Sequence, residues 1–332
     1  MILLWGLPAD GPLAAVAKRL RQLGVPAFLL DQRLIARTAV SVTAAPSPSG
    51  VISIDGVDVL ALEDVTAAYI RPHDSRRIIE RTAPGDPHAA ARAAQADMAM
   101  LTWADISPAL VLNRPEAMTS NDSKPYQAAF IARHGLRVPD TLITTDVGAL
   151  REFRDRHGEL IYKSVSSTRS IVARLGDEHS GRLDSLRWCP TQFQQHVAGT
   201  DFRVHVVADD IFATEISSEA DDYRYASRTG HGADLRPALL PVEVADRCRR
   251  LALALGLPLA GIDLRRTPEG EWYCFEVNPS PGFTYYQQHT GMPIDLAVAR
   301  HLAGDAARAR SRLRLVAAGG GVGGLDRRQQ RR

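Results

Sequence analysis

The first 31 residues constrain the fold most, because they contain an apolar strand, an amphipathic helix and a second apolar strand in succession. "MILLWGL" and "PAFLLD" both have the character of buried strands. Apolar residues between them recur at helical spacing: Leu13, Val16, Ala17, Leu20 and Leu23. Gly24 can end that helix. Strands that alternate with helices predict an α/β domain built on a partly parallel sheet.

The rest of the N-terminal third continues this alternation. A hairpin-like region is predicted around "GVISIDGVDV", a strand at "VTAAYIRP" and a helix over much of "PHAAARAAQADMAMLTWADI". After the first strand comes "GLPADGP", which is not the glycine-rich loop of dinucleotide-binding domains. A nicotinamide-dependent enzyme is therefore not expected.

Length and composition narrow the class of protein further. The 332 residues exceed what one hydrophobic core usually holds, so two or three domains are expected. The net charge of +2 does not point to nucleic acid or to a membrane surface. Cys189, Cys248 and Cys274 form neither a metal motif nor a disulfide framework, which indicates a reducing cytoplasm. The N-terminal apolar run is too short for a signal peptide or a membrane span.

Two lysines occupy positions where a cation is unfavourable. Ser123 is a plausible N-cap, Pro125 fits the first turn and Gly135 fits the C′ position, so Lys124 lies at a helix start. The helix macrodipole disfavours a cation there, and the lysine is either solvated or directed at an anion. Lys163 lies in the apolar strand "LIYKSV", where an unpaired ammonium group is costly.

Two polar segments are candidate ligand-binding loops. The turn "SVSSTRS" offers hydroxyls and Arg169 to a polyphosphate, although a plain polar hairpin loop explains it about as well. The segment "SSEADDYRYASRTGHGAD" is long for a loop inside a compact domain, so it is functional or flexible. Within it, Arg224 could meet a substrate, but alone it is better explained as a solvated surface arginine.

A predicted hairpin near the C-terminus brings three oxygen-bearing side chains together. The strands "GIDLRR" and "EWYCFEVN" share one apolar face: Ile262, Leu264, Tyr273, Phe275 and Val277. Asp263, Glu276 and Asn278 then lie on the other face. A two-residue loop of Glu269 and Gly270 places Asp263 opposite Glu276, whereas a bulged turn would shift this register.

This arrangement predicts a metal site. Two carboxylates that face each other across strands repel, and a divalent cation between them reverses that interaction. Carboxylate and amide oxygens suit a hard cation such as Mg²⁺. The stretch "CFEVNPSPGF" alone is explained better by an ordinary strand end. Asp263, Glu276 and Asn278 together outweigh that explanation.

The order of Lys124, Lys163, "QFQQHV", "DFR", "GID" and "FEVNPSPG" resembles that of ATP-grasp ligases. Within that superfamily the chain resembles the RimK-type and microviridin-ligase (graspetide synthetase) branch, whose members act mainly on peptides. The likeness covers roughly residues 112–303. It implies an α/β (α+β) ATP-grasp fold with four parts: a pre-ATP-grasp α/β domain (1–112), a central subdomain (113–195), a C-terminal subdomain with the metal site (196–318) and a disordered basic tail (319–332).

The resemblance also implies roles for individual residues. Lys124 and Lys163 would contact the ATP phosphates, assisted by Ser166, Ser167 and Arg169 of a phosphate loop that lacks the glycine usual in relatives. The hinge beside adenine would consist of Gln194, Gln195, His196 and Val197. Arg203 would hold the γ-phosphate or the acyl phosphate, and Arg203, Lys163 and Arg224 are the catalytic candidates. Two Mg²⁺ ions, with Mn²⁺ as an alternative, would be held by Asp263, Glu276 and Asn278.

The expected function is that of a cytoplasmic, ATP-dependent carboxylate–amine or carboxylate–hydroxyl ligase. It would act through an acyl phosphate, release ADP and modify a peptide, with no nucleic-acid or membrane partner and with a homodimer as the expected assembly. One alternative is a small-molecule ligase of the glutathione synthetase or D-Ala–D-Ala ligase type. Another is a non-catalytic ATP-binding module, against which the three intact metal ligands argue.

Overall fold

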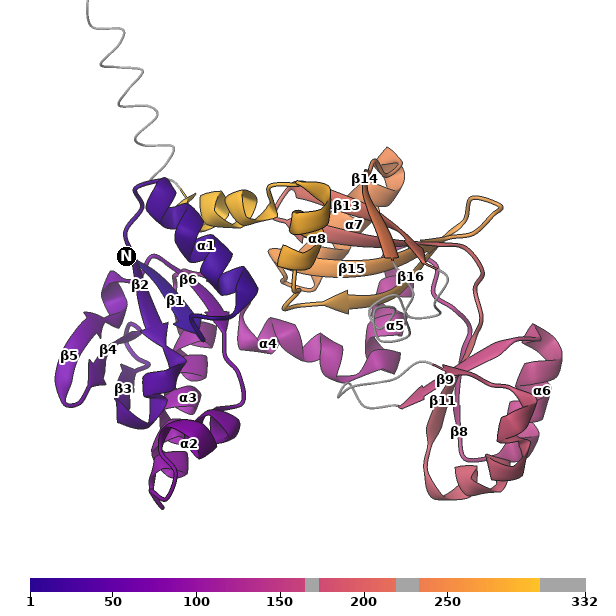
Figure 1. Cartoon of the computed structure of the whole chain (residues 1–332), viewed down its shortest axis with the longest axis horizontal. Helices are drawn as coiled ribbons and strands as arrows, with labels where there is room; N and C mark the ends of the chain where they lie inside the picture. The colour runs from indigo at the N-terminus through magenta and orange to yellow at the C-terminus, as the bar shows by residue number, and fades with distance from the viewer. Residues whose placement is uncertain (165–172, 219–232, 305–332) are drawn as a thin grey trace, which may run out of the picture.

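The structure, a computed structural model, describes residues 1–164, 173–218 and 233–304. The N-terminal region contains a parallel sheet in the order β2-β1-β6-β7 (Figure 1). Its strands are β1 (Ile2–Gly6), β2 (Ala27–Asp31), β6 (Ala67–Arg71) and β7 (Leu110–Leu112). The sequence predicted this parallel arrangement, because helix α1 (Gly11–Gln22) must carry the chain back between β1 and β2.

Alternate residues of β1 point into two different cores. Ile2 and Leu4 pack with α1, while Leu3 and Trp5 pack with α3 (Ala89–Ile106) on the other face. A second, antiparallel sheet of β3 (Thr38–Thr43), β4 (Ser49–Ile54) and β5 (Val57–Ala61) flanks this domain. The sequence predicted only its β4–β5 hairpin. Helix α2 (Ser75–Thr82) completes the region.

The middle of the chain forms a four-stranded sheet with helices beside it. Helices α4 (Pro115–Met118) and α5 (Lys124–Arg133) lead into the sheet, whose order is β10-β9-β11-β8. Its elements are β8 (Thr141–Thr144), α6 (Val147–His157), β9 (Leu160–Ser164), β10 (Ala173–Arg174) and β11 (Thr191–Gln195). As predicted, Ser123 caps α5 and Asp146 caps α6.

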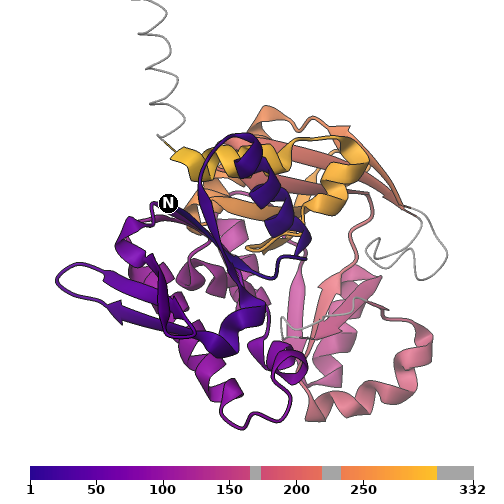
Figure 2. The same ribbon diagram turned by 60° about the vertical axis from the view of Figure 1, so that its left-hand side comes forward.

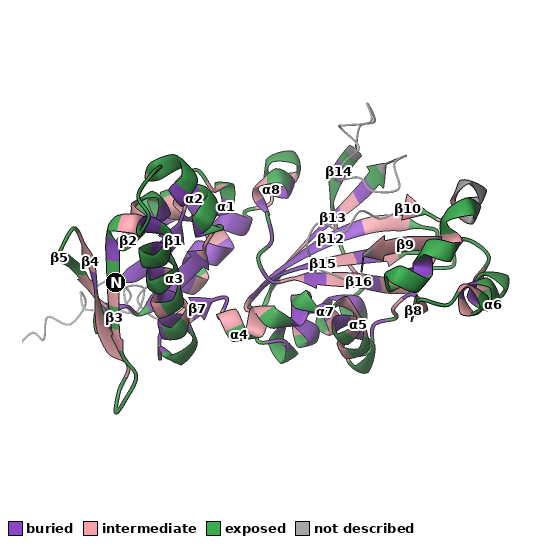
Figure 3. Ribbon diagram, turned by 90° about the horizontal axis from the view of Figure 1, so that it is seen from below, coloured by how far each residue is buried: buried purple, intermediate pink, exposed green. Residues whose placement is uncertain are grey.

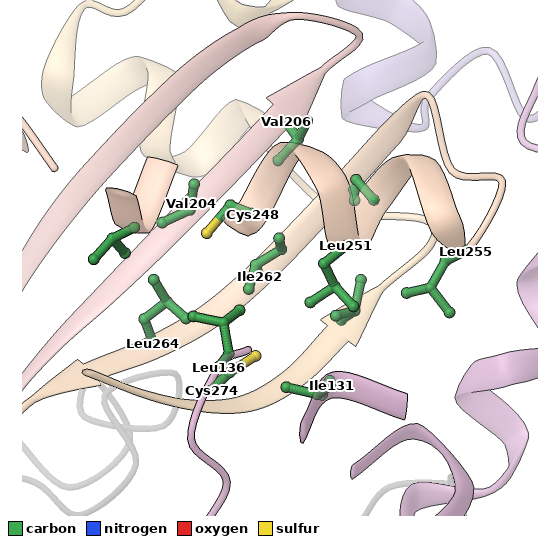
Figure 4. Close-up of a cluster of buried hydrophobic side chains, with 14 of the residues drawn as sticks. Ile131, Leu136, Val204, Val206, Cys248, Leu251, Leu255, Ile262, Leu264 and Cys274 are labelled. Carbon is green, nitrogen blue, oxygen red and sulfur yellow. The ribbon is translucent and has the colours of Figure 1, made fainter. Parts of the chain in front are cut away.

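The C-terminal region is a five-stranded antiparallel sheet in the order β14-β13-β12-β15-β16. Its strands are β12 (Thr200–Val207), β13 (Asp210–Ser218), β14 (Ala233–Ala238), β15 (Leu259–Arg266) and β16 (Trp272–Asn278). Helix α7 (Val242–Ala254) and α5 cover one face and bury a core that includes Val204, Cys248 and Ile262 (Figure 4). Most residues of β12 and β15 are buried (Figure 3).

The C-terminal helices return to the start of the chain. After α8 (Thr284–Thr290), a helix described over residues 294–304 packs against α1 (Figure 2). Arg19 of α1 also makes a bidentate ion pair with the buried Asp295, at 2.9 Å for the shorter contact. The predicted division into domains and its boundaries stay a prediction. No helix within the described ranges is long and apolar enough to cross a membrane.

The β15–β16 hairpin confirms the predicted pairing of Asp263 with Glu276, but its turn differs from the predicted one. Asp263 lies opposite Glu276, as predicted. The predicted two-residue turn is wrong: Thr267 N bonds to Glu271 O at 2.9 Å, so three residues form the loop. A bulge at Phe275 then restores the pairing.

This bulge also changes the apolar face of β16. Cys274 and Val277 are its buried residues, whereas the predicted Tyr273 and Phe275 are only partly buried. The predicted face was wrong because a strict period of two cannot pass through the extra residue that a bulge inserts.

Candidate active site

Three charged residues lie in a row across three neighbouring strands of the C-terminal sheet. In the strand registers, Arg203 of β12 faces Asp263 of β15, which in turn faces Glu276 of β16. Arg203 Nη1 donates to Asp263 Oδ1 at 2.6 Å, and their side chains are only 6% and 22% exposed. Since water screens such a pair weakly, the guanidinium offsets part of the repulsion between the two carboxylates.

The next row of the same face leaves room for the arginine. Gly261 is the cross-strand partner of Asn278, and a Cβ atom on Gly261 would lie 2.4 Å from Arg203 Nη2. It would also lie 2.8 Å from the Cβ of Pro281 in the turn after β16. The Arg203 guanidinium lies 5.7 Å from the ring centre of Tyr286 on α8. The absence of a side chain at position 261 therefore allows the arginine and the Pro-Ser-Pro-Gly turn to come together.

Replacing Gly261 with alanine should therefore displace Arg203 from Asp263 and lower the rate of ATP turnover about 10-fold to 100-fold, a cost of roughly 1.4 to 3 kcal/mol. The expected loss is in turnover more than in folding, because the guanidinium is the mobile end of a long side chain. Steady-state kinetics and a thermal melt will separate the two effects. Unchanged turnover in a folded G261A protein would show that the position of Arg203 is not critical.

The donor set fits a hard divalent cation. Asp263, Glu276 and Asn278 offer only oxygen ligands on one sheet face, and Asn278 Oδ1 also accepts from Ser280 N at 2.8 Å. Within the described ranges, no three His, Cys, Asp or Glu side chains gather as metal ligands. Mg²⁺ usually takes one or two protein carboxylates together with substrate phosphates. These three residues therefore suit an ion that a bound nucleotide helps to hold.

Lys163 forms a hydrogen bond with the predicted hinge. Its Nζ donates to Gln194 Oε1 at 3.1 Å, and Gln194 Nε2 donates to Thr141 Oγ1 at 2.9 Å. The sequence uses arginine almost everywhere: it has three lysines among its 40 basic residues. Two of these three are the predicted phosphate ligands Lys124 and Lys163. A compact ammonium group at both positions is consistent with contact to a phosphate as a point charge.

The predicted hinge joins the central and C-terminal sheets. Backbone N–H groups of Gln195 and His196 donate to Asp140 O at 2.9 Å and to Glu159 O at 3.0 Å. Val197 O accepts from Arg265 Nη1 at 2.8 Å. Arg265 is in turn held by Asp201 through two hydrogen bonds of 2.7 and 2.8 Å. Val197 is thus anchored to the same sheet face as Arg203, and its role beside adenine stays a prediction.

Two buried amide side chains position β16, the strand that carries Glu276 and Asn278. The sequence did not predict their role. Gln127 of α5 donates to Val277 O at 2.8 Å and accepts from Val277 N at 2.9 Å. Asn113 donates to Leu259 O and to Pro279 O, both at 2.6 Å. Both side chains lie on otherwise apolar surfaces, which is the signal that could have identified them. Gln127 thus ties α5, which begins at Lys124, to the strand of Glu276 and Asn278, and Asn113 ties the end of β7 to the turn after that strand.

The remaining predicted residues cannot be placed. Ser166, Ser167, Arg169 and Arg224 lie outside the described residues, as does the predicted tail 319–332. Of the three cysteines, Cys248 and Cys274 are buried and Cys189 is exposed. Burial raises the pKa of Cys248 to about 12 and the pKa of Cys274 well above the usual thiol value. These two buried thiols are therefore poor nucleophiles at neutral pH.

His205, the next residue on the face of Arg203, makes the domain sensitive to acid. It is fully buried, and this burial is the main reason why its pKa is well below the usual 6.5. The nearby positive charge of Arg203 lowers the pKa further. In the unfolded chain His205 takes up a proton near pH 6.5, whereas in the folded protein it stays neutral. The free energy of unfolding therefore falls as the pH drops from 6.5 toward the folded pKa. The slope is about 1.4 kcal/mol per pH unit.

We therefore expect the Tm of the wild type to fall below pH 6.5 relative to that of the His205→Phe variant. Phenylalanine keeps a ring against Tyr286, 5.0 Å away in the present structure, without a titrating group. His88→Gln, at an exposed histidine, is the matched control and should follow the wild type. Parallel Tm curves for wild type and His205→Phe would refute the assignment.

Comparison with known proteins decides the family. A model of the RimK-like ATP-grasp domain matches residues 121–302, which is more than half of the chain. The chain belongs to the RimK-like ATP-grasp family. The ATP-grasp resemblance and the mixed α/β fold predicted from the sequence are thus confirmed.

Individual relatives cover different parts of the chain. A probable alpha-L-glutamate ligase of Picosynechococcus sp. (strain ATCC 27264 / PCC 7002 / PR-6) is 25% identical over 206 residues, 59% of this chain and 67% of that protein. The ATP-grasp ligase PsnB, solved with a phosphomimetic variant of its minimal precursor, Mg and ADP, is 25% identical with a TM-score of 0.74. That alignment covers 92% of this chain and 98% of PsnB.

The macrocyclase MdnC of Microcystis aeruginosa MRC, solved with precursor peptide MdnA, shares the fold at 21% identity and a TM-score of 0.75. The alignment covers 92% of this chain and all of MdnC, 100% of its length. The region before residue 121, which the family model does not cover, thus also has its counterpart in whole ligase structures.

Proposed function

We propose that this protein is an ATP-dependent ligase that activates a carboxylate of a peptide as an acyl phosphate and transfers the acyl group to an amine or a hydroxyl. The observation that carries the proposal is the row of Arg203, Asp263 and Glu276 on one sheet face of a RimK-like ATP-grasp domain. A carboxylate attacks the γ-phosphate only when the negative charge on both partners is neutralised.

The described residues supply most of this neutralisation. Lys163 would meet the nucleotide phosphates beside the hinge, and Arg203 would hold the transferred phosphoryl group. Asp263, Glu276 and Asn278 would hold Mg²⁺, for which two ions are proposed, and the metal would lower the charge on the phosphates. Attack at the γ-phosphorus leaves ADP, and loss of phosphate from the acyl phosphate completes the transfer.

The peptide substrate is the part of the proposal that rests on similarity. PsnB and MdnC were solved with precursor peptides, and both align along nearly their full lengths with this chain. The alpha-L-glutamate ligase relative supports the addition of an amino acid instead of ring closure within a peptide. A homodimer, a cytoplasmic location and the lack of nucleic-acid or membrane partners stay predictions.

The test is mass spectrometry of synthetic peptides after incubation with enzyme, ATP and Mg²⁺. Each peptide of the set carries one Asp or Glu together with one Thr, Ser or Lys, and free L-glutamate is supplied in a parallel arm. Internal condensation lowers the mass by about 18 Da per bond, whereas residue addition raises it, since both are acyl transfers. An ATP-dependent change of either kind supports a peptide-modifying ligase. No change in any peptide, together with turnover on small carboxylates alone, would contradict it.

A further inference from the structure

The strand order of the N-terminal sheet reverses between β1 and β6. These two parallel strands are neighbours, but β1 leads through α1 to β2 on one side and β6 leads through α2 and α3 to β7 on the other. Ligands of open α/β sheets bind where the strand order reverses in this way. Asp10 follows β1 at this edge, Arg71 is the last residue of β6 and His73 follows it.

The side chains of Arg71 and His73 both contact that of Asp10. Asp10 Oδ1 accepts from Arg71 Nε at 2.7 Å and from Leu13 N at 3.0 Å, while Asp10 Oδ2 lies 3.5 Å from His73 Nε2. The Asp10 side chain is 9% exposed, whereas the His73 side chain is 47% exposed. A fixed carboxylate beside an accessible imidazole is the arrangement that orients a histidine for proton transfer.

The backbone of His73 is held as firmly as the carboxylate. The buried Gln32 side chain donates to His73 O at 2.7 Å and accepts from His73 N at 2.8 Å. These two hydrogen bonds fix the position of the His73 backbone, from which the ring reaches to 3.5 Å from Asp10 Oδ2. Rigid placement of this kind is what a catalytic group requires.

Arg71 connects this edge of the N-terminal sheet to the turn that follows β16. Its Nη1 donates to Ser280 Oγ at 2.9 Å and to Pro281 O at 3.3 Å, in the turn that follows Asn278. This edge of the sheet therefore borders the turn beside the proposed acyl-phosphate site. The described residues proposed to hold the phosphates and the metal are cations, amides and carboxylates that would be committed to the metal. None of these is suited to accept a proton from an incoming amine or hydroxyl.

We propose that His73, oriented by Asp10, is the general base that activates the acceptor nucleophile; this rests on the ligase function proposed above. Nε2–H would face Asp10, and Nδ1 would take the one proton that the acceptor hydroxyl or neutral amine loses as it attacks. The bond from the acceptor oxygen or nitrogen to the acyl carbon forms as the carbon–oxygen bond to phosphate breaks. Inorganic phosphate leaves, and His73 returns its proton to phosphate or water. The 3.5 Å contact exceeds a hydrogen bond, as is common for catalytic contacts before substrate binds.

The experiment compares two nucleophiles on His73→Gln. The first is the acceptor side chain of whichever synthetic peptide the wild type modifies. The second is hydroxylamine, which is largely unprotonated at neutral pH and attacks acyl phosphates without a base. Loss of general-base catalysis should lower ligation about 10²-fold to 10⁴-fold. Hydroxamate formation and ADP release with hydroxylamine should stay at the wild-type level.

Three outcomes decide the proposal. His88→Gln, an exposed histidine of the same domain, should leave both reactions unchanged. Wild-type ligation by His73→Gln, or a parallel loss of ligation and of hydroxamate, would overturn the role of His73 and leave the ligase function standing. Failure of the wild type itself to form a hydroxamate would overturn the ligase function and the base together. A thermal melt of His73→Gln with an unchanged Tm confirms that the comparison concerns a folded protein.

Discussion

Replacing Glu276 with alanine should lower ADP formation by about 10²-fold to 10³-fold or more, because it removes charge stabilisation of the phosphoryl-transfer transition state. The fold should survive, since the change also removes a carboxylate that faces Asp263 across the strands. Asp263 keeps its hydrogen bond to Arg203 Nη1, at 2.6 Å. ADP release and a thermal melt will report the two properties separately.

Glu271→Ala is the matched control for this variant. Glu271 lies in the same hairpin, where its exposed carboxylate pairs with Arg137 at 2.7 Å. Exposed ion pairs contribute about 0 to 1 kcal/mol, so both stability and turnover should change little. Turnover at the wild-type rate in Glu276→Ala, with Mg²⁺ present, would exclude Glu276 as a metal ligand.

Replacing Lys163 with methionine should weaken ATP binding about 10-fold to 100-fold, since a hydrogen bond to a charged group is worth about 1.5 to 3 kcal/mol. Methionine keeps the apolar stem that lies in β9 but removes the ammonium group 3.1 Å from Gln194 Oε1. Turnover should fall as well, because the same charge would face the phosphates in the transition state. Calorimetry gives the affinity, and steady-state kinetics give the rate.

Lys18→Met, at an exposed lysine on α1, controls for the general loss of one positive charge. It should bind ATP as the wild type does. If Lys163→Met also bound ATP unchanged and turned over at the wild-type rate, Lys163 would be a lysine whose stem lies on the apolar surface while its charge stays in water.

Local patterns predicted the metal face because its geometry depends on strand period. Asp263 and Glu276 face each other as the alternation of side chains requires. The length of the turn and the bulge at Phe275 were not predictable, since both depend on how the hairpin packs against α5 and α7 rather than on the order of residues. The two errors cancelled. The loop is one residue longer than predicted and β16 contains one extra residue at the bulge, so Asp263 still lies opposite Glu276.

Contacts between distant segments escaped the sequence reasoning for a different reason. Arg71 and Ser280 are 209 residues apart, and Gln127 and Val277 are 150 residues apart. Each of these residues is unremarkable in its own segment: an arginine that ends a strand, a glutamine on a helix. Their significance arises only when the N-terminal sheet and α5 are brought against β16. The role of the N-terminal domain in the site could therefore not be predicted without the structure.

The central claim is that the substrate carboxylate itself becomes the phosphorylated species. The measurement that tests it most directly adds hydroxylamine to wild-type enzyme, ATP, Mg²⁺ and the peptide that the mass-spectrometric screen identifies. The account predicts a hydroxamate on that peptide and ADP in equal amounts, because attack at the γ-phosphorus leaves the α–β linkage untouched. Intact-mass analysis should show an unmodified enzyme. Release of AMP and pyrophosphate, or a phosphorylated or acylated enzyme, would contradict the mechanism.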